Sequence, residues 1–230
     1  MTSGGLGRAT RTGLRWLLAL VAGGVVLLAL VSVLYTLGRP VSTLMLGRWA
    51  TLKPVERQWT PLATISPYLP AAVIMAEDAR FCRHHGVDWD ALGSVLSEAD
   101  EDGPQRGAST LTMQLVKNLY LWPGRSFIRK AIEIPLALAL DLVWSKKQIM
   151  EAYLNVAEWG EGIFGAEAAA RHAFGKSAAA LTPREAALLA TALPNPRLRH
   201  PDKPGRRHAT LAQIVGNRAA AGAIWTDCMR

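Results

Sequence analysis

Three short segments of the chain carry side chains suited to acid–base chemistry or to anion binding. The first begins at Glu77, which follows the apolar run 71–76. Partial burial would raise the pKa of this carboxylate and suit it to general-base catalysis, whereas a solvated or ion-paired helix face is the alternative. His84 and His85 are adjacent, so they point to different faces. Since no acid or cysteine stands at ligand spacing, we expect capping or packing rather than metal binding.

The second segment, 107–118, follows Gly107 with polar residues at helical spacing. On a helix, one face would carry four of them at positions i, i+4, i+7 and i+8, namely Thr110, Gln114, Lys117 and Asn118. Ser109 or Thr110 can cap this helix. Polar groups of this kind can hold a phosphate or a sugar. An ordinary amphipathic surface helix would show the same pattern, so spacing alone leaves both interpretations open.

The third segment is rich in cations. Between Arg106 and Lys130 there are five Lys or Arg residues and no acid, although residues 58–196 hold 12 cations and 15 acids in total. Such a cluster could neutralise a pyrophosphate. Glu133 lies one helical turn beyond Arg129 and Lys130, so it could pair with either cation. It could equally help to hold a divalent metal ion, or form a plain surface ion pair.

An apolar stretch, residues 16–37, precedes these three segments in the chain. Of its 22 residues, 18 are hydrophobic and none is charged. As a helix it would span about 33 Å, enough for a bilayer core of about 30 Å. Three arginines precede it, Arg8, Arg11 and Arg15. Because positive charge flanking a membrane span is usually cytoplasmic, we expect residues 1–15 to form a cytoplasmic N-terminus. We expect an uncleaved transmembrane anchor, because the apolar part of a cleaved signal peptide is shorter. Residues 38–69 would form a membrane-proximal connector.

The remainder, residues 70–230, reads as one mostly α-helical domain. Ser145 with Gln148 and Thr182 with Glu185 have the spacing of capping boxes. Few stretches alternate as strands do. We expect helices from Pro70 through Glu77 and over about 89–96, 110–120, 126–144, 145–158, 182–193 and 208–225.

Charge and composition exclude several classes of protein. The net charge is +8, but seven cations and one acid lie in residues 1–57, and seven cations and two acids in residues 197–230. This distribution favours anionic lipid headgroups over nucleic acid as a partner. Outside residues 16–37 the apolar content is ordinary, which excludes a polytopic membrane protein and a disordered chain. Cys82 and Cys228 could form a disulfide or remain free thiols.

Taken together, the segments resemble the family 51 glycosyltransferase domain that polymerises peptidoglycan. Residues 77–88 resemble its E-D-x-x-F-x-x-H-x-G-x-D motif, 107–118 resemble G-x-S-T-x-x-Q-Q-x-x-K-N, and 129–133 resemble R-K-x-x-E. Residues 145–155 and 162–196 resemble its two later blocks, and all five occur in the family's order. Met113 replaces the first glutamine of the second motif.

The resemblance implies a lysozyme-like helical domain that forms β-1,4 linkages from lipid II with inversion and releases polyprenyl diphosphate. Glu77 and Glu133 would be catalytic, and Glu133 would hold Mg²⁺ if a metal binds. Substrate would be held by Ser109, Gln114, Lys117, Asn118, Arg125, Arg129 and Lys130. Lipid II, the growing glycan strand, membrane lipids and cell-wall synthesis or division proteins would be partners, at the periplasmic face of the inner membrane. A glycan hydrolase and a non-catalytic membrane-anchored scaffold are the alternatives.

Overall fold

The computed structural model describes residues 12–13, 15–16, 19, 23–24, 27, 30–35, 38–98, 108–124, 126–221 and 223–229. The chain divides into two compact units, Met1–Arg39 and Pro40–Arg230. In the first unit, the described residues up to Tyr35 are helical. Among all described residues, no helix is both long and apolar enough to cross a membrane. The anchor expected over residues 16–37, half of which lie outside the described residues, therefore stays a prediction. Residues 99–107, between α4 and α5, also lie outside them.

Residues 40–69 contribute regular elements to the same compact unit as residues 70–230. They form α2 (Thr43–Ala50), β1 (Glu56–Arg57) and the short 3-10 helix η1 (Leu62–Thr64). β1 pairs in parallel with β3 (Ile163–Phe164), which pairs antiparallel with β2 (Glu158–Gly160). Strands of two or three residues are too short to show alternation, so sequence reasoning did not find this sheet.

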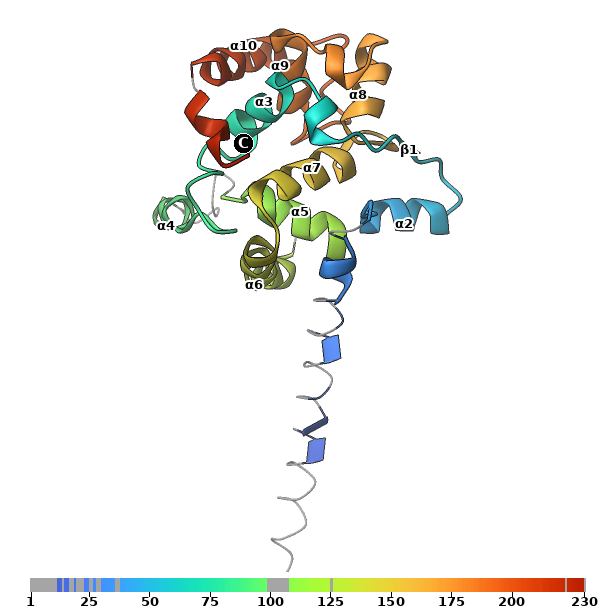
Figure 1. The fold of residues 1–230 in the computed structure, drawn as a ribbon, viewed down its shortest axis with the longest axis vertical. Coiled ribbons are helices and arrows are strands. Elements are labelled where there is room, and N and C mark those ends of the chain that lie inside the picture. Colours follow the sequence, from blue (N-terminus) through green and yellow to red (C-terminus); the bar gives the residue numbers. More distant parts are fainter. Residues whose placement is uncertain are drawn as a thin grey trace, which may run out of the picture. The chain divides into compact units, whose positions relative to one another are not determined.

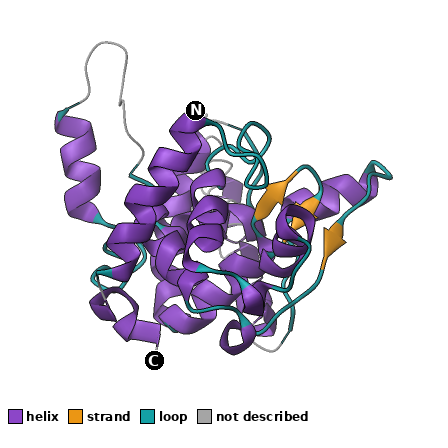
Figure 2. Cartoon of the chain, turned by 90° about the horizontal axis from the view of Figure 1, so that it is seen from above, coloured by secondary structure: helices purple, strands orange, loops and turns teal. Residues whose placement is uncertain are grey.

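The rest of the unit is helical, as expected (Figures 1 and 2). Its elements are α3 (Tyr68–Glu77), α4 (Trp89–Ser97), α5 (Leu111–Tyr120), α6 (Phe127–Val143), α7 (Lys146–Val156), α8 (Ala166–Phe174), η2 (Ala178–Ala180), α9 (Pro183–Ala192), α10 (Arg206–Ala220) and η3 (Ala223–Met229). Thr110 caps α5, and both predicted capping boxes are present, which confirms these helix starts. The last predicted helix is two elements, because α10 stops at Ala220.

The core is built around α3, which packs against α9 and α10, while α5 packs against α6 and α7. α3 is apolar on nearly every face, with Leu69, Val73 and Ile74 fully buried. A helix that is apolar all round belongs in a protein interior, and each such side chain contributes about 1.5–3 kcal/mol on burial. The core therefore holds α3 rigidly, and the C-terminal residue of that helix is Glu77.

A disulfide joins Cys82, in the loop between α3 and α4, to Cys228 in η3. η3 also packs against α3 and α7. The two cysteines are 146 residues apart, so the bond encloses α4 to α10 in one covalent loop. The question that the sequence left open is thus answered in favour of a pair.

Candidate active site

Glu77 combines burial with one uncommitted oxygen atom. Its Oε2 accepts a hydrogen bond of 2.9 Å from Nε2 of Gln114, while Oε1 is buried and has no partner among the described residues. Burial raises the pKa of Glu77, and the bond from Gln114 and the charges of Lys117 and Arg199 oppose that rise. A carboxylate with a raised pKa and a free oxygen is equipped to accept a proton.

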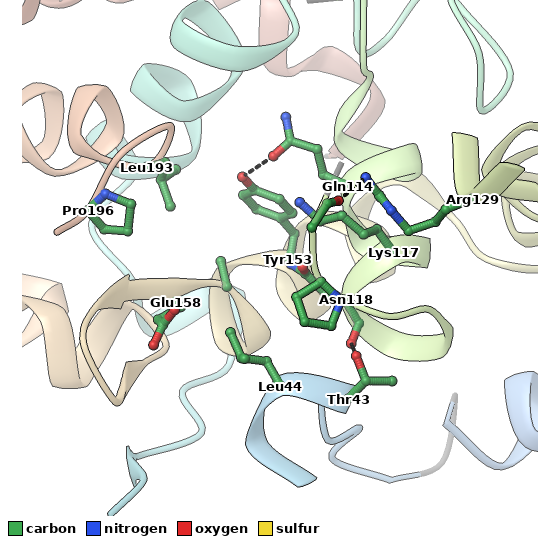
Figure 3. Close-up of a pocket in the computed structure, with 13 residues that line it drawn as sticks. Thr43, Leu44, Gln114, Lys117, Asn118, Arg129, Tyr153, Glu158, Leu193 and Pro196 are labelled. Carbon is green, nitrogen blue, oxygen red and sulfur yellow. Dashed lines mark hydrogen bonds between the residues drawn. The ribbon is translucent and has the colours of Figure 1, made fainter. Parts of the chain in front are cut away.

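A chain of hydrogen bonds orients this carboxylate. The hydroxyl of Tyr153 donates to Oε1 of Gln114 over 3.0 Å (Figure 3). This bond leaves the amide nitrogen of Gln114 to face Glu77. Burial raises the pKa of Tyr153 well above its ordinary value, so the phenol keeps its proton and remains a donor. Sequence reasoning missed Tyr153, although it stands in the block 145–155; no spacing rule links it to Gln114.

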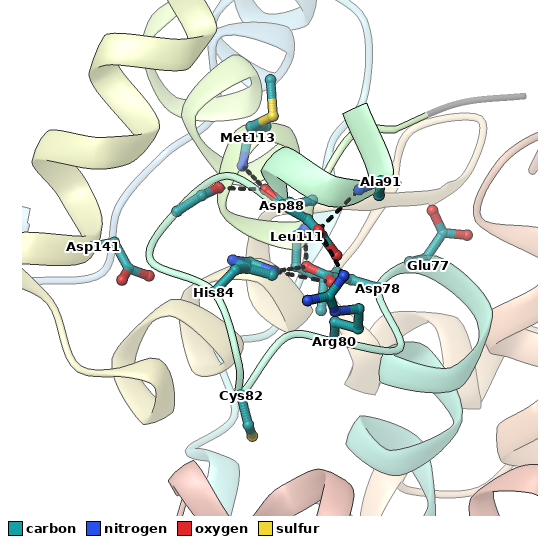
Figure 4. Close-up of polar contacts among 12 residues, drawn as sticks. Glu77, Asp78, Arg80, Cys82, His84, Asp88, Ala91, Leu111, Met113 and Asp141 are labelled. Atoms are coloured by element: carbon teal, nitrogen blue, oxygen red, sulfur yellow. Dashed lines mark hydrogen bonds and ion pairs between the residues drawn. The ribbon is translucent and has the colours of Figure 1, made fainter. Parts of the chain in front are cut away.

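The loop after Glu77 is fixed by its polar residues (Figure 4). Both carboxylate oxygens of Asp78 lie 3.0 Å from Nε2 of His84, and Oδ2 also accepts from the backbone N–H of Leu111 at the start of α5. Asp88 caps α4. His84 is therefore a buried packing and hydrogen-bonding residue, as expected. This network joins the end of α3 to the start of α5, which carry Glu77 and Gln114.

Gly86 completes the same loop. Its φ is +79°, and a Cβ at this position would fall 2.4 Å from the carbonyl oxygen of Ala137 in α6. Only glycine tolerates both the left-handed backbone and that close approach. The hydroxyl of Thr110 donates to the Gly86 carbonyl over 2.6 Å. The motif glycine thus lets the loop lie directly on α6.

The predicted cations gather around Glu133 at the junction of α5 and α6. Both Arg129 and Lys130 form ion pairs with its carboxylate, which is 3% exposed. Nζ of Lys130 lies 3.0 Å from Oε2 of Glu133 and donates to Oγ of Ser109 over 2.6 Å. Burial lowers the pKa of Lys117, while the nearby Glu133 carboxylate opposes that effect. Two cations on one buried carboxylate form a rigid anion-binding group.

Two cavities border these residues. The first, of about 370 Å³, is lined by Thr43, Leu44, Gln114, Lys117, Asn118, Pro123, Gly124, Arg129, Tyr153, Ala157, Glu158, Leu193 and Pro196 (Figure 3). The second, of about 220 Å³, is bordered by Glu77 and Ser109. Gln114 lines the first and Glu77 the second, so their hydrogen bond links one lining residue of each cavity. Arg125 lies outside the described residues, and its predicted role is untested.

The carboxylate of Glu133 and its surroundings do not fit a metal-binding site. Both oxygens of Glu133 accept from cations, and no group of three or more His, Cys, Asp or Glu residues in the described part of the chain could hold a metal. The geometry gives Glu133 a different task, namely fixing Arg129 and Lys130. Met113, the departure from the second motif, is 1% exposed and lies on the core face of α5. Its side chain therefore faces away from the cavities.

Comparison with known proteins identifies the class of enzyme. The family model for transglycosylases matches residues 45–220, and the chain belongs to that family. It is 58% identical to a biosynthetic peptidoglycan transglycosylase of Brucella suis over 84% of this chain and 86% of the relative. A protein of the same name from Rhodopseudomonas palustris is 51% identical over 97% of both chains. The chain is thus a peptidoglycan glycosyltransferase, which confirms the family resemblance and the glycan-polymerising activity predicted from the sequence.

Proposed function

We propose that the protein polymerises glycan strands from lipid II. The 4-hydroxyl of an acceptor GlcNAc attacks C1 of a donor MurNAc, and the C1–oxygen bond to the pyrophosphate breaks on the opposite face. The new β-1,4 linkage is therefore inverted relative to the donor. The observation that carries this proposal is the buried Oε1 of Glu77, which has no partner among the described residues, together with the neighbouring cavity lined by Lys117 and Arg129.

Glu77 acts as the general base. Its Oε1 takes the proton of the 4-hydroxyl while the oxygen–C1 bond forms. Oε2 is held by its bond from Gln114 and so faces away from the substrate. Only Oε1 of Glu77 presents a lone pair to the substrate hydroxyl. The raised pKa of Glu77 makes it a stronger base than an exposed glutamate, which helps the transfer of a hydroxyl proton.

The cations stabilise the leaving group. The departing pyrophosphate takes the electron pair of the broken bond, and Lys117 and Arg129 line the cavity that would receive it. Lys130 stands beside them through its bonds to Glu133 and Ser109. The positions of Ser109, Gln114 and Asn118 suit contacts to donor sugar or phosphate. The predicted need for Mg²⁺ rests on the family resemblance, and none of these steps runs through a metal ion.

Glycan hydrolysis fits the site less well. A hydrolase needs a carboxylic acid that protonates the leaving sugar, usually opposite a second carboxylate. Here the other buried carboxylates near the cavities are committed to protein partners: Glu133 pairs with Arg129 and Lys130, Asp78 bonds to His84 and Asp88 caps α4. Cations that face a cavity favour an anionic leaving group, which lipid II has and a glycan strand lacks. The lysozyme-like character that we propose concerns the helical fold, not the reaction.

We propose that residues 16–37 anchor the enzyme in the inner membrane, with the catalytic unit in the periplasm. The disulfide between Cys82 and Cys228 supports that side of the membrane, because such bonds persist in oxidising compartments. Exposed apolar side chains on α2 and at the start of α6, including Trp49, Phe127 and Ile128, offer a further surface for lipid.

One experiment tests the reaction. The full chain in detergent is incubated with labelled lipid II and Mg²⁺, and the products are separated on a gel. Long strands should form, and Glu77→Gln should abolish them. Glu56→Gln, the same change at an exposed strand residue, should leave them intact. Shortening of added glycan without polymerisation would establish a hydrolase instead, and strand formation by Glu77→Gln would refute the base assignment.

A further inference from the structure

The cavity of about 370 Å³, which we call the donor cavity, carries charges of opposite sign on its two sides. Lys117 and Arg129 border it on one side, and Glu158 borders it on the other (Figure 3). Glu158 is the one acid among the described residues that line this cavity. It is the first residue of β2, between residues 145–155 and 162–196, so no motif singled it out. The leaving pyrophosphate accounts for the two cations and gives this carboxylate no task.

Protein contacts use only part of the hydrogen-bonding capacity of Glu158. Its Oε1 accepts from the backbone N–H of Gly162 over 3.0 Å. Nη1 of Arg48 lies 4.0 Å from the same oxygen, which is too long for a hydrogen bond. Oε2 has no hydrogen-bond partner in the described part of the chain. A carboxylate offers about four acceptor positions, so this side chain, which is 14% exposed, still has acceptor positions for a group in the cavity.

The charge of Glu158 is not needed to balance its neighbour. Nη1 of Arg48 also lies 3.8 Å from the carboxylate of Glu161, whose side chain is 67% exposed. One guanidinium thus stands beside two carboxylates, and the three groups together carry one excess negative charge. Glu161 shares the cation with Glu158 but does not line the donor cavity. The two acids therefore differ in the property that matters here, which is access to the cavity.

The two sides of the donor cavity select different chemical groups. An anion is attracted by Lys117 and Arg129 and repelled by Glu158. A neutral group that donates an O–H or N–H binds well at Glu158, because hydrogen bonds to a carboxylate are stronger than those between neutral groups. Lipid II, the donor of the proposed reaction, has both kinds of group side by side, since its pyrophosphate is bonded directly to an N-acetylated sugar.

We propose that Glu158 orients the donor lipid II by accepting a hydrogen bond from an O–H or N–H group of its MurNAc unit, an inference that rests on the proposed function. The free donors on that unit are the 6-hydroxyl and amide N–H groups. With the pyrophosphate held by Lys117 and Arg129 and the sugar held by Glu158, the donor has one orientation in the cavity. The reverse orientation would place the pyrophosphate against a carboxylate.

The test measures binding to the full chain in detergent with two probes. One is fluorescent lipid II whose GlcNAc 4-hydroxyl is methylated, so that it can react only as the donor, and the other is inorganic pyrophosphate. Glu158→Gln can keep the bond from Gly162 but loses the charge, so Kd for the blocked lipid II should rise about tenfold, equivalent to about 1.4 kcal/mol. Kd for pyrophosphate should fall, because the repulsion is removed. Glu161→Gln is the matched control beside Arg48 and should change neither Kd.

Changes of opposite sign for the two probes separate an orienting role from a structural one. Weaker binding of both probes by Glu158→Gln, or equal effects in Glu161→Gln, would overturn the proposal, because Glu158 would then only support Arg48 and the turn. Blocked lipid II that lacks the 6-hydroxyl of MurNAc identifies the donor group. If Glu158→Gln no longer changes Kd for this probe, the group is that hydroxyl, and if the tenfold change persists, it is an amide N–H.

The same measurement distinguishes this inference from the proposed function. If the wild type does not bind blocked lipid II, the proposed function fails and this inference fails with it. If the wild type binds blocked lipid II and Glu158→Gln binds it equally well, the inference alone is refuted.

Discussion

The amide nitrogen of Gln114 donates to Oε2 of Glu77 over 2.9 Å, and Oε1 of the same carboxylate has no partner in the described part of the chain. This bond favours the charged form of Glu77, against the burial that disfavours it. Gln114→Leu should therefore raise the pKa of Glu77 further. Because the base must be deprotonated, the acid limb of the kcat/KM profile should move to higher pH, with the largest loss of activity under acidic conditions.

Tyr153→Phe is the companion change for that measurement. It removes the hydroxyl that fixes the Gln114 amide but leaves the amide itself, so the acid limb should move in the same direction by less. A lower kcat with an unmoved acid limb in both variants would mean that Gln114 acts on the substrate and does not tune Glu77.

Glu77→Gln should lower kcat about 10²- to 10⁴-fold, the usual contribution of a general base. The same change should raise Tm at neutral pH. A carboxylate whose folded pKa is raised lowers stability once the pH exceeds its unfolded pKa, and a neutral amide lacks that cost. Calorimetry at pH 7.5 and pH 4 checks the sign, since the gain should shrink at the lower pH. A variant less stable than the wild type at pH 7.5 would contradict this account.

Glu133→Gln should destabilise the protein by about 3–5 kcal/mol, because it leaves the buried Arg129 without its counter-charge. Urea unfolding of the catalytic unit measures this effect. Asp90→Asn is the control, since it breaks only an exposed, solvent-screened pair with Arg80 and should leave the unfolding transition nearly unchanged. Similar losses in the two variants would show that Glu133 does not organise the cation cluster.

Reduction of the disulfide should lower the free energy of unfolding by about 4–5 kcal/mol, the chain-entropy value for a loop of this size. Urea titrations with and without dithiothreitol measure the change. The Cys82→Ser/Cys228→Ser variant should match the reduced protein and be insensitive to the reductant. If the wild type unfolds at the same urea concentration in both conditions, the bond does not contribute to stability.

Helix starts were predictable from the sequence because capping is local. Thr110, Ser145 and Thr182 each bond to a backbone N–H three residues ahead, and that spacing is visible in the chain. The cation cluster was predictable for the same reason, since Arg129 and Lys130 are one turn from Glu133. The hydrogen bond between Tyr153 and Gln114 was not predictable from the sequence, because it depends on how α5 packs against α7.

The region 40–69 shows a second limit. Its prolines suggest a connector, yet α2 docks onto the chain far away in sequence, where the Thr43 hydroxyl donates to the carbonyl oxygen of Leu121 over 2.6 Å. The guanidinium of Arg57 likewise donates to the Asn155 carbonyl. Such long-range side-chain to backbone bonds leave no periodic signal. The sequence also could not decide between a disulfide and two free thiols, because the separation of two cysteines in sequence does not give their distance in the fold.

The order of the two cysteines along the chain has a consequence for biogenesis. Cys228 follows α3 to α10 in sequence, so synthesis delivers every described α-helix of the catalytic unit before the second thiol is available. Until then Cys82, in the loop after Glu77, is a lone thiol that can form mixed disulfides with other proteins. Closure of the covalent loop is therefore a late event in maturation, and a protease cut between α4 and α10 made after it would leave the fragments joined.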